Sequence, residues 1–81
     1  MTTMTREHAR ETVRTALAGF ATDEDWAALS PGENFRDVLE LDSLDFLTFV
    51  ERLADATGKR IDESDYPRLT TVDGCVGFLV S

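Results

Sequence analysis

Apolar residues recur at helical spacing in several stretches of this 81-residue chain, starting with residues 5–20. That first stretch has apolar residues at Ala9, Val13, Ala16, Leu17 and Phe20. An i, i+4, i+7, i+8 spacing predicts an amphipathic helix with one buried face. Thr3 or Thr5 can cap its N-terminus, and Gly19 lies near its expected end.

A second helix is predicted from Asp42-Ser43 to about Thr57, with Gly58 as its stop. Asp42 at the N-cap, with Asp45 three residues later, resembles a capping box. At about 100° per residue, one face of this helix is apolar and is expected in the core: Phe46, Phe49, Val50 and Leu53. The opposite face carries Leu44, Thr48, Glu51 and Asp55, with Leu47 at its margin.

A long connection of residues 21–41 separates these two helices. Residues 23–25 and 30–32 have the composition of turns. Several apolar residues between them predict that the connection is held against the core: Trp26, Leu29, Phe35, Val38 and Leu39. A connection of this length is usually functional or partly structured.

The C-terminal third predicts a short element after Ile61, limited by Pro67, and a last helix. The last helix starts at Thr70 or Thr71 and has apolar residues at Val72, Cys75, Val76 and Leu79. Gly74 and Gly77 weaken it, so tertiary packing must hold it. The predicted fold is all-α: one domain of residues 1–81, a small four-helix bundle of three main helices and one short helix, with a long loop after the first.

Composition agrees with a folded domain, because 42% of the residues are hydrophobic and 30% are charged. The formal net charge is -8, and residues 1–22 alone carry a small positive excess. An acidic surface disfavours nucleic acid and anionic membranes and attracts basic protein partners, although it can also serve solubility alone.

Several site classes and locations are disfavoured by the sequence. The single cysteine, Cys75, excludes an internal disulfide and a multi-cysteine metal site. The acidic clusters 23–25 and 62–65 lack the glycine and glutamate of a calcium loop, so we expect no metal site. No apolar run approaches the roughly 20 residues of a membrane span, and the first ten residues lack a signal-peptide core. We therefore expect a cytoplasmic protein without membrane contact.

The candidate chemistry centres on Ser43, between Asp42 and Leu44 at the predicted start of the second helix. Such a serine can cap the helix or present an exposed hydroxyl for attachment. A catalytic nucleophile is disfavoured, because the only histidine, His8, lies on the first helix and no GxSxG turn surrounds Ser43. We therefore expect a protein that is not an enzyme.

The sequence "LDSLDF", a helix ending in "VERL", then Ile61, an acidic "DESD" and "LTTV" together resemble the acyl carrier proteins. The resemblance is strong from residue 35 to 80 and weaker over residues 1–34. It implies that Ser43 receives 4'-phosphopantetheine from coenzyme A and that the distal thiol carries acyl groups as thioesters. It also implies that Asp42 and Leu44 belong to the motif that the phosphopantetheinyl transferase reads.

The resemblance implies further sites and partners. Acyltransferases, synthases or ligases would load and use the carrier, which we expect to be a monomer. The implied partner-facing residues are Leu44, Leu47, Glu51 and Asp55, to which we add Arg52 as a local pairing group or a selector of partners. The implied acyl-chain cavity is lined by Phe35, Leu53, Ile61, Leu69 and Cys75.

This chain departs from the family pattern at several positions. Glu40 stands where glycine is common, and Asp62 where proline often occurs. Thr48 and Ala54 replace frequent acidic residues, Arg52 adds a positive charge, and Tyr66 is bulky. These departures favour a dedicated biosynthetic pathway over general fatty-acid synthesis. Tyr66 and Phe46 would narrow a cavity, which suggests cargo that is short, polar or held outside.

Two other functions stay open at this stage. One is a freestanding peptidyl or aminoacyl carrier of a nonribosomal pathway, which Asp42 disfavours because such carriers more often have a Gly-Gly-x-Ser motif. The other is an acidic interaction module that is never modified.

Overall fold

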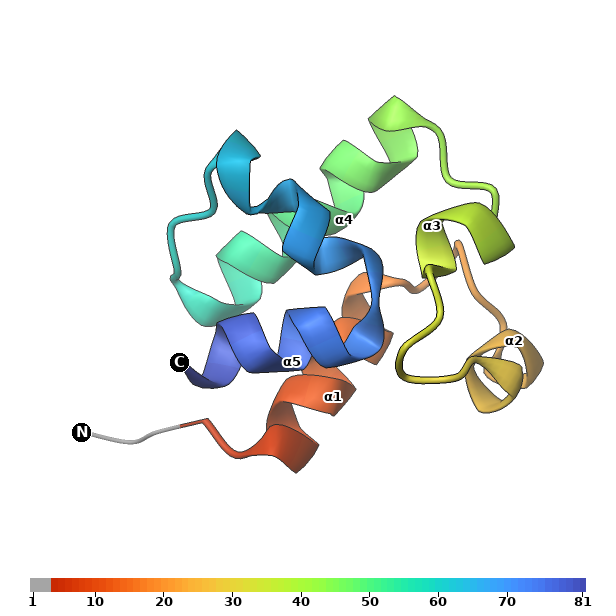
Figure 1. Cartoon of the computed structure of the whole chain (residues 1–81), viewed down its shortest axis with the longest axis horizontal. Coiled ribbons are helices and arrows are strands. Elements are labelled where there is room, and N and C mark those ends of the chain that lie inside the picture. Colours follow the sequence, from red (N-terminus) through yellow and green to blue (C-terminus); the bar gives the residue numbers. More distant parts are fainter. Residues whose placement is uncertain (1–3) are drawn as a thin grey trace.

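The computed structural model describes residues 4–81 and is all-helical in that range, with no β-strand (Figure 1). The fold class predicted from the sequence is therefore confirmed. The elements in chain order are α1 (Arg6–Ala16), α2 (Asp23–Ala28), α3 (Phe35–Val38), α4 (Ser43–Thr57), the 3-10 helix η1 (Glu63–Thr70) and α5 (Val72–Val80).

Helix α1 is shorter than predicted, ending at Ala16 where the sequence pattern continues to Phe20. The chain turns at Gly19, whose φ of 88° is in the left-handed region. The N–H groups of Phe20 and Ala21 donate back to the carbonyl of Leu17 at 2.9 and 3.0 Å. At the other end Thr5 caps the helix by accepting a hydrogen bond from the His8 N–H; the alternative cap, Thr3, lies outside the described residues.

The long connection contains the two short helices α2 and α3. Helix α2 starts with a reciprocal capping box between Thr22 and Asp25. Leu29 and Phe35 are buried and Trp26 and Leu39 partly buried, as predicted for a segment held against the core. Val38 was predicted to join them and does not, since 52% of it is exposed. Phe35 and Leu39 take the inward side of the single turn of α3, which leaves Val38 outside.

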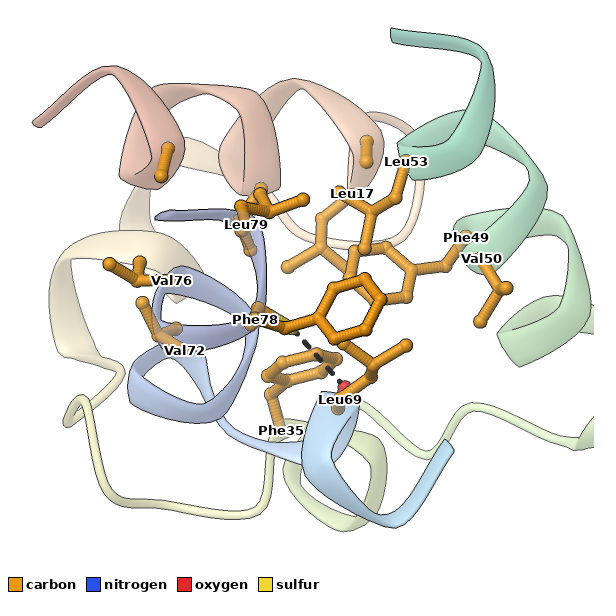
Figure 2. Packing of buried hydrophobic residues seen from close by; sticks show 14 of the residues in the cluster. Leu17, Phe35, Phe49, Val50, Leu53, Leu69, Val72, Val76, Phe78 and Leu79 are labelled. Atoms are coloured by element: carbon orange, nitrogen blue, oxygen red, sulfur yellow. Dashed lines mark hydrogen bonds between the residues drawn. The ribbon is translucent and has the colours of Figure 1, made fainter. Parts of the chain in front are cut away.

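The core lies between α1, α4, η1 and α5, and α1 packs against both α4 and α5 (Figure 2). Phe35, Phe49, Leu17, Leu53 and Leu69 are fully buried and point toward one another. Burying a side chain of this size contributes roughly 1.5–3 kcal/mol. In a chain this small, which has a thin core, each of these contacts is a large share of the total stability.

Helix α5 begins at Val72 and is capped by Thr71, whose hydroxyl accepts from the Gly74 N–H at 2.9 Å. A Cβ atom on Gly74 would collide with the backbone carbonyl of Arg68 in η1. This glycine therefore permits close packing of α5 on η1. Gly77 has no neighbour near its Cβ position, so it has no comparable role.

Candidate functional site

Ser43 is the first residue of α4 and is exposed. The cap of α4 is the preceding residue, Asp42, whose carboxylate accepts a hydrogen bond from the Asp45 N–H at 2.8 Å. Both residues are described by the structure, and the Asp42 N–H makes no bond to the Asp45 carboxylate. The cap is therefore not the full capping box that the sequence resembles. Because Asp42 caps the helix, the Ser43 hydroxyl has no capping role and is available for other chemistry.

Arg36 is the side chain that contacts this hydroxyl, and sequence reasoning missed it. Its Nη2 donates to Ser43 Oγ at 3.5 Å, and its Nε donates to the Leu41 carbonyl at 3.4 Å. The guanidinium also lies over the Phe46 ring, 4.8 Å from its centroid. The bond to Ser43 is long, so Arg36 lies beside the hydroxyl without holding it tightly.

The turn between α3 and α4 brings Arg36 next to Ser43, seven positions away in sequence. The Leu41 N–H donates to the Arg36 carbonyl at 2.9 Å, which folds the chain back on itself. Glu40, inside this turn, has a φ of 53°, a left-handed conformation that favours glycine. The glycine common at this position in the acyl carrier proteins that the sequence resembles could have indicated this turn. Nothing in the sequence indicated that Arg36 contacts Ser43.

The arrangement fits a phosphodiester on Ser43. The oxygen is exposed, so an enzyme that transfers a group to it has access. A phosphate there meets the positive end of the α4 dipole, worth about 0.3–1 kcal/mol at an exposed site. The Arg36 guanidinium adds a cation on one side. No histidine faces the hydroxyl, because His8 is exposed on α1.

The predicted partner-facing residues lie on the exposed side of α4. Leu44 is 74% exposed and Leu47 is 39% exposed, and Glu51 and Asp55 are exposed farther along the helix. Sequence reasoning missed Val38, which is also a large exposed hydrophobic residue and belongs to α3. In residues 4–81, Val38, Leu44 and Leu47 are the large exposed hydrophobics, and all three lie on the helices flanking the Asp42-Ser43 junction.

Arg52 lies in a different setting from these residues. Its Nη1 donates to the carbonyls of Ala18 at 2.6 Å and Ala16 at 3.2 Å, and its guanidinium lies over the Phe20 ring. These bonds satisfy carbonyls at the C-terminal end of α1 and tie that end to α4. The bonds of Arg52 are therefore to backbone carbonyls 34 and 36 positions away in sequence, and not to neighbouring side chains of α4 as local pairing would require. Contact between Arg52 and a partner protein stays a prediction.

The residues assigned to an acyl cavity form part of the packed core. Phe35, Leu53, Leu69 and Cys75 have no exposed surface, whereas Ile61 is partly buried at the edge. Cys75 Sγ contacts the Leu69 carbonyl at 3.4 Å, and burial raises the pKa of the Cys75 thiol to about 12. A surface hollow of about 360 Å³ lies between α1 and α4, and none of these residues lines it. An acyl cavity among them stays a prediction.

The Phe46 ring makes an edge contact with Tyr66, with 5.7 Å between ring centroids and a 78° interplanar angle. It also contacts Phe49, which packs edge-on against Phe35 at 5.2 Å. Four aromatic rings in contact thus lead from partly buried Tyr66 to fully buried Phe35 in the core.

Residues 4–81 contain no group of three or more histidine, cysteine, aspartate or glutamate side chains that could hold a metal ion. No helix in the same range is long and apolar enough to span a bilayer.

Comparison with known proteins identifies the class to which this fold and site belong. Residues 11–79 match the family model described as "Phosphopantetheine attachment site", so the chain belongs to that family. Three similar proteins are named acyl carrier protein. The protein from Rubrobacter xylanophilus is 34% identical over 69% of each chain. The protein from Myxococcus xanthus is 30% identical over 88% of this chain and 94% of its own. The protein from Micrococcus luteus is 30% identical over 88% and 91%. No solved structure gives a significant match.

The family defines the chain as a phosphopantetheine-dependent carrier protein, similar to acyl carrier proteins. It is a carrier and not an enzyme, and its prosthetic group is 4'-phosphopantetheine. A phosphopantetheinyl transferase and the enzymes of a biosynthetic pathway are its general partners.

Proposed function

We propose that Ser43 is the residue that carries 4'-phosphopantetheine. The observation that supports it most directly is the division of roles at the start of α4, where Asp42 caps the helix and the Ser43 hydroxyl is exposed. In the transfer, Ser43 Oγ bonds to the phosphorus bearing pantetheine, and a pyrophosphate P–O bond of coenzyme A breaks. 3',5'-ADP leaves, and the hydroxyl proton passes to a base of the transferase.

The attached arm ends in a thiol that holds acyl intermediates as thioesters. We assign the carrier to fatty-acid, polyketide or related specialised biosynthesis, with a dedicated pathway favoured by the departures at Glu40, Arg52 and Tyr66. A freestanding peptidyl or aminoacyl carrier is the second candidate, and Asp42 favours the acyl carrier over it. An unmodified interaction module is a third, and membership of the family argues against it.

The cargo is short, polar or held outside the core. The edge contact of Tyr66 with Phe46 supports this proposal, because it fills the space beneath the start of α4. The full burial of Phe35, Leu53 and Leu69 in one cluster supports it as well. A long acyl chain could enter only by separating these packed side chains.

Partner enzymes bind the exposed side of α4 through Leu44 and Leu47, with Asp42 and Leu44 also read by the transferase. Glu51 and Asp55 on the same helix attract basic patches, and high salt weakens that attraction. Val38 on α3 extends the apolar contact. We further propose that residues 1–81 act as a single monomeric domain in the cytoplasm, without nucleic-acid or membrane partners.

Intact-protein mass spectrometry tests the function. The chain is incubated with coenzyme A, Mg²⁺ and a broad-specificity phosphopantetheinyl transferase, alongside Ser43→Ala. The expected result is a gain of one phosphopantetheine by the parent chain alone. Equal gain by Ser43→Ala, in a sample shown to be folded by circular dichroism, would place the group elsewhere.

A further inference from the structure

We propose that Arg36 is the phosphodiester-binding residue of the attachment site. The inference rests on the proposed attachment at Ser43 and adds a specific role for a side chain outside the Asp-Ser-Leu motif. Arg36 pairs with the anionic phosphate oxygens at the base of the attached arm and offsets the acidic residues around them.

The Arg36 guanidinium lies within reach of a phosphate group on Ser43. Arg36 Nη2 lies 3.5 Å from Ser43 Oγ, the oxygen that becomes the bridging atom of the phosphodiester. The nonbridging oxygens are two bonds farther along the arm and carry the negative charge. A guanidinium already beside Oγ reaches them through small side-chain rotations, and its planar set of N–H donors matches two phosphate oxygens.

The surroundings of Arg36 show why its charge is available. In residues 4–81 no carboxylate lies within ion-pair distance of it, whereas Arg14 and Arg60 pair with Asp23 and Asp62. The contacts of the Arg36 guanidinium are the Leu41 carbonyl, the Ser43 hydroxyl and the Phe46 ring. These neutral groups orient the guanidinium without neutralising it.

The local charge balance favours such a cation. Asp42 caps α4 and Asp45 lies in its first turn, whereas Asp37 belongs to α3 and Glu40 to the turn between the two helices. A phosphodiester adds another negative charge among four carboxylates, and like charges at short range oppose it. Arg36 is the basic residue that the fold places at this position, since Arg52 is bonded to the end of α1.

Side-chain NMR of the parent chain provides a test that needs no variant. The Arg36 Nε–H resonance is recorded before and after attachment, with Arg60 as the internal reference because it lies outside the site and pairs with Asp62. We expect a downfield shift of the Arg36 resonance on attachment and no change at Arg60. An unchanged Arg36 resonance in a chain whose mass shows full attachment would overturn the proposal.

A stability comparison provides the second test. Tm is measured before and after attachment for the parent, Arg36→Gln, Arg36→Lys and the control Arg60→Gln. The Arg36 variants lose the contacts with Phe46 and Leu41 in both the modified and the unmodified form. This loss of stability therefore cancels in the difference in Tm between the two forms. We expect attachment to lower the Tm of Arg36→Gln by about 4 °C more than that of the parent, with partial recovery in Arg36→Lys.

The outcomes separate the two proposals. If the parent chain accepts no phosphopantetheine, the attachment at Ser43 fails and the role of Arg36 fails with it. If all four chains are modified and attachment changes their Tm equally, Ser43 stands as the site and the role of Arg36 is refuted.

Discussion

The Asp42 carboxylate accepts the Asp45 N–H at 2.8 Å, and this bond begins the helix whose first residue is Ser43. The Asp42-Ser43 pair thus divides two tasks between neighbouring side chains. The aspartate caps the N-terminus of α4, and the serine hydroxyl stays exposed, as the proposed attachment requires. A substitution at Asp42 should therefore change stability through the cap and modification through the motif, and the two effects can be separated.

Asp42→Ala should destabilise the chain by about 1 kcal/mol, because it removes an N-cap from a helix that supplies much of the core. Asp42→Asn keeps a side-chain oxygen and should retain most of that stability. Urea unfolding monitored by circular dichroism measures both. Equal loss in the two variants would show that the charge of Asp42, and not its hydrogen bond, is what α4 requires.

Glu40→Gly should stabilise the chain. The left-handed φ of 53° at Glu40 destabilises the folded state by roughly 1–2 kcal/mol for a residue with a Cβ, and glycine removes this strain. Glycine also gives the unfolded chain more conformational freedom, which offsets about 0.5–1 kcal/mol of the stabilisation. We expect a net increase of about 0.5–1 kcal/mol in the free energy of unfolding. Glu40→Ala is the control, because it removes the same charge and keeps the strain. A similar gain in both variants would attribute the effect to charge.

Gly74→Ala and Gly77→Ala form a matched pair in α5. The added methyl at position 74 would collide with the Arg68 carbonyl, so we expect a loss of about 1–3 kcal/mol. At position 77 the same methyl meets no neighbour, and the higher helix propensity of alanine should add up to about 1 kcal/mol. Denaturant unfolding of both variants checks the contrast, and two losses of similar size would contradict it.

Cys75 predicts an alkaline pH dependence of stability. Burial raises its pKa from 9.0 to about 12, so the unfolded chain releases the thiol proton at a lower pH than the folded chain does. The stability contributed by the protonated, buried Cys75 thiol is therefore fully present below pH 9 and is lost as the pH rises from 9 toward 12. The expected slope is on the order of 1 kcal/mol per pH unit.

The measurement for Cys75 is urea unfolding of the parent and Cys75→Ala at pH 7, 9, 10 and 11. Cys75→Ala should be less stable at pH 7, because it leaves space beside Leu69, but its stability should fall less steeply at high pH. Titration of other groups affects both chains and cancels in the comparison. Parallel curves for the two chains would mean that the thiol is more accessible than its burial indicates.

The sequence predicted the parts of this fold that depend on periodicity and capping. The apolar face of α4, its cap at Asp42 and its end at Gly58 follow from local spacing and local chemistry, and the structure confirms them. The end of α1 was predicted one turn too late, because Phe20 continues the apolar spacing beyond the point where Gly19 turns the chain. Val38 was wrongly placed in the core, because a one-turn helix buries only part of an apolar run.

The candidate site could be predicted from the sequence only as far as it consists of adjoining residues. Ser43, Asp42 and Leu44 adjoin in sequence, so a short match identified them together. Arg36 reaches Ser43 only because the turn at Glu40 folds α3 back toward α4, and no periodic pattern encodes that contact. Arg52 shows the same limit, since its bonds are to carbonyls more than thirty positions away on α1.

The central claim is that Ser43 carries the prosthetic group, and the chain offers three other serines as internal controls: Ser30, Ser64 and Ser81. The most direct measurement is tandem mass spectrometry of peptides from the parent chain after modification by the transferase. We predict that the phosphopantetheine is found on the peptide containing Ser43 and that fragmentation localises it to that residue. Localisation to another serine, or an unmodified Ser43 in a folded chain, would contradict the account.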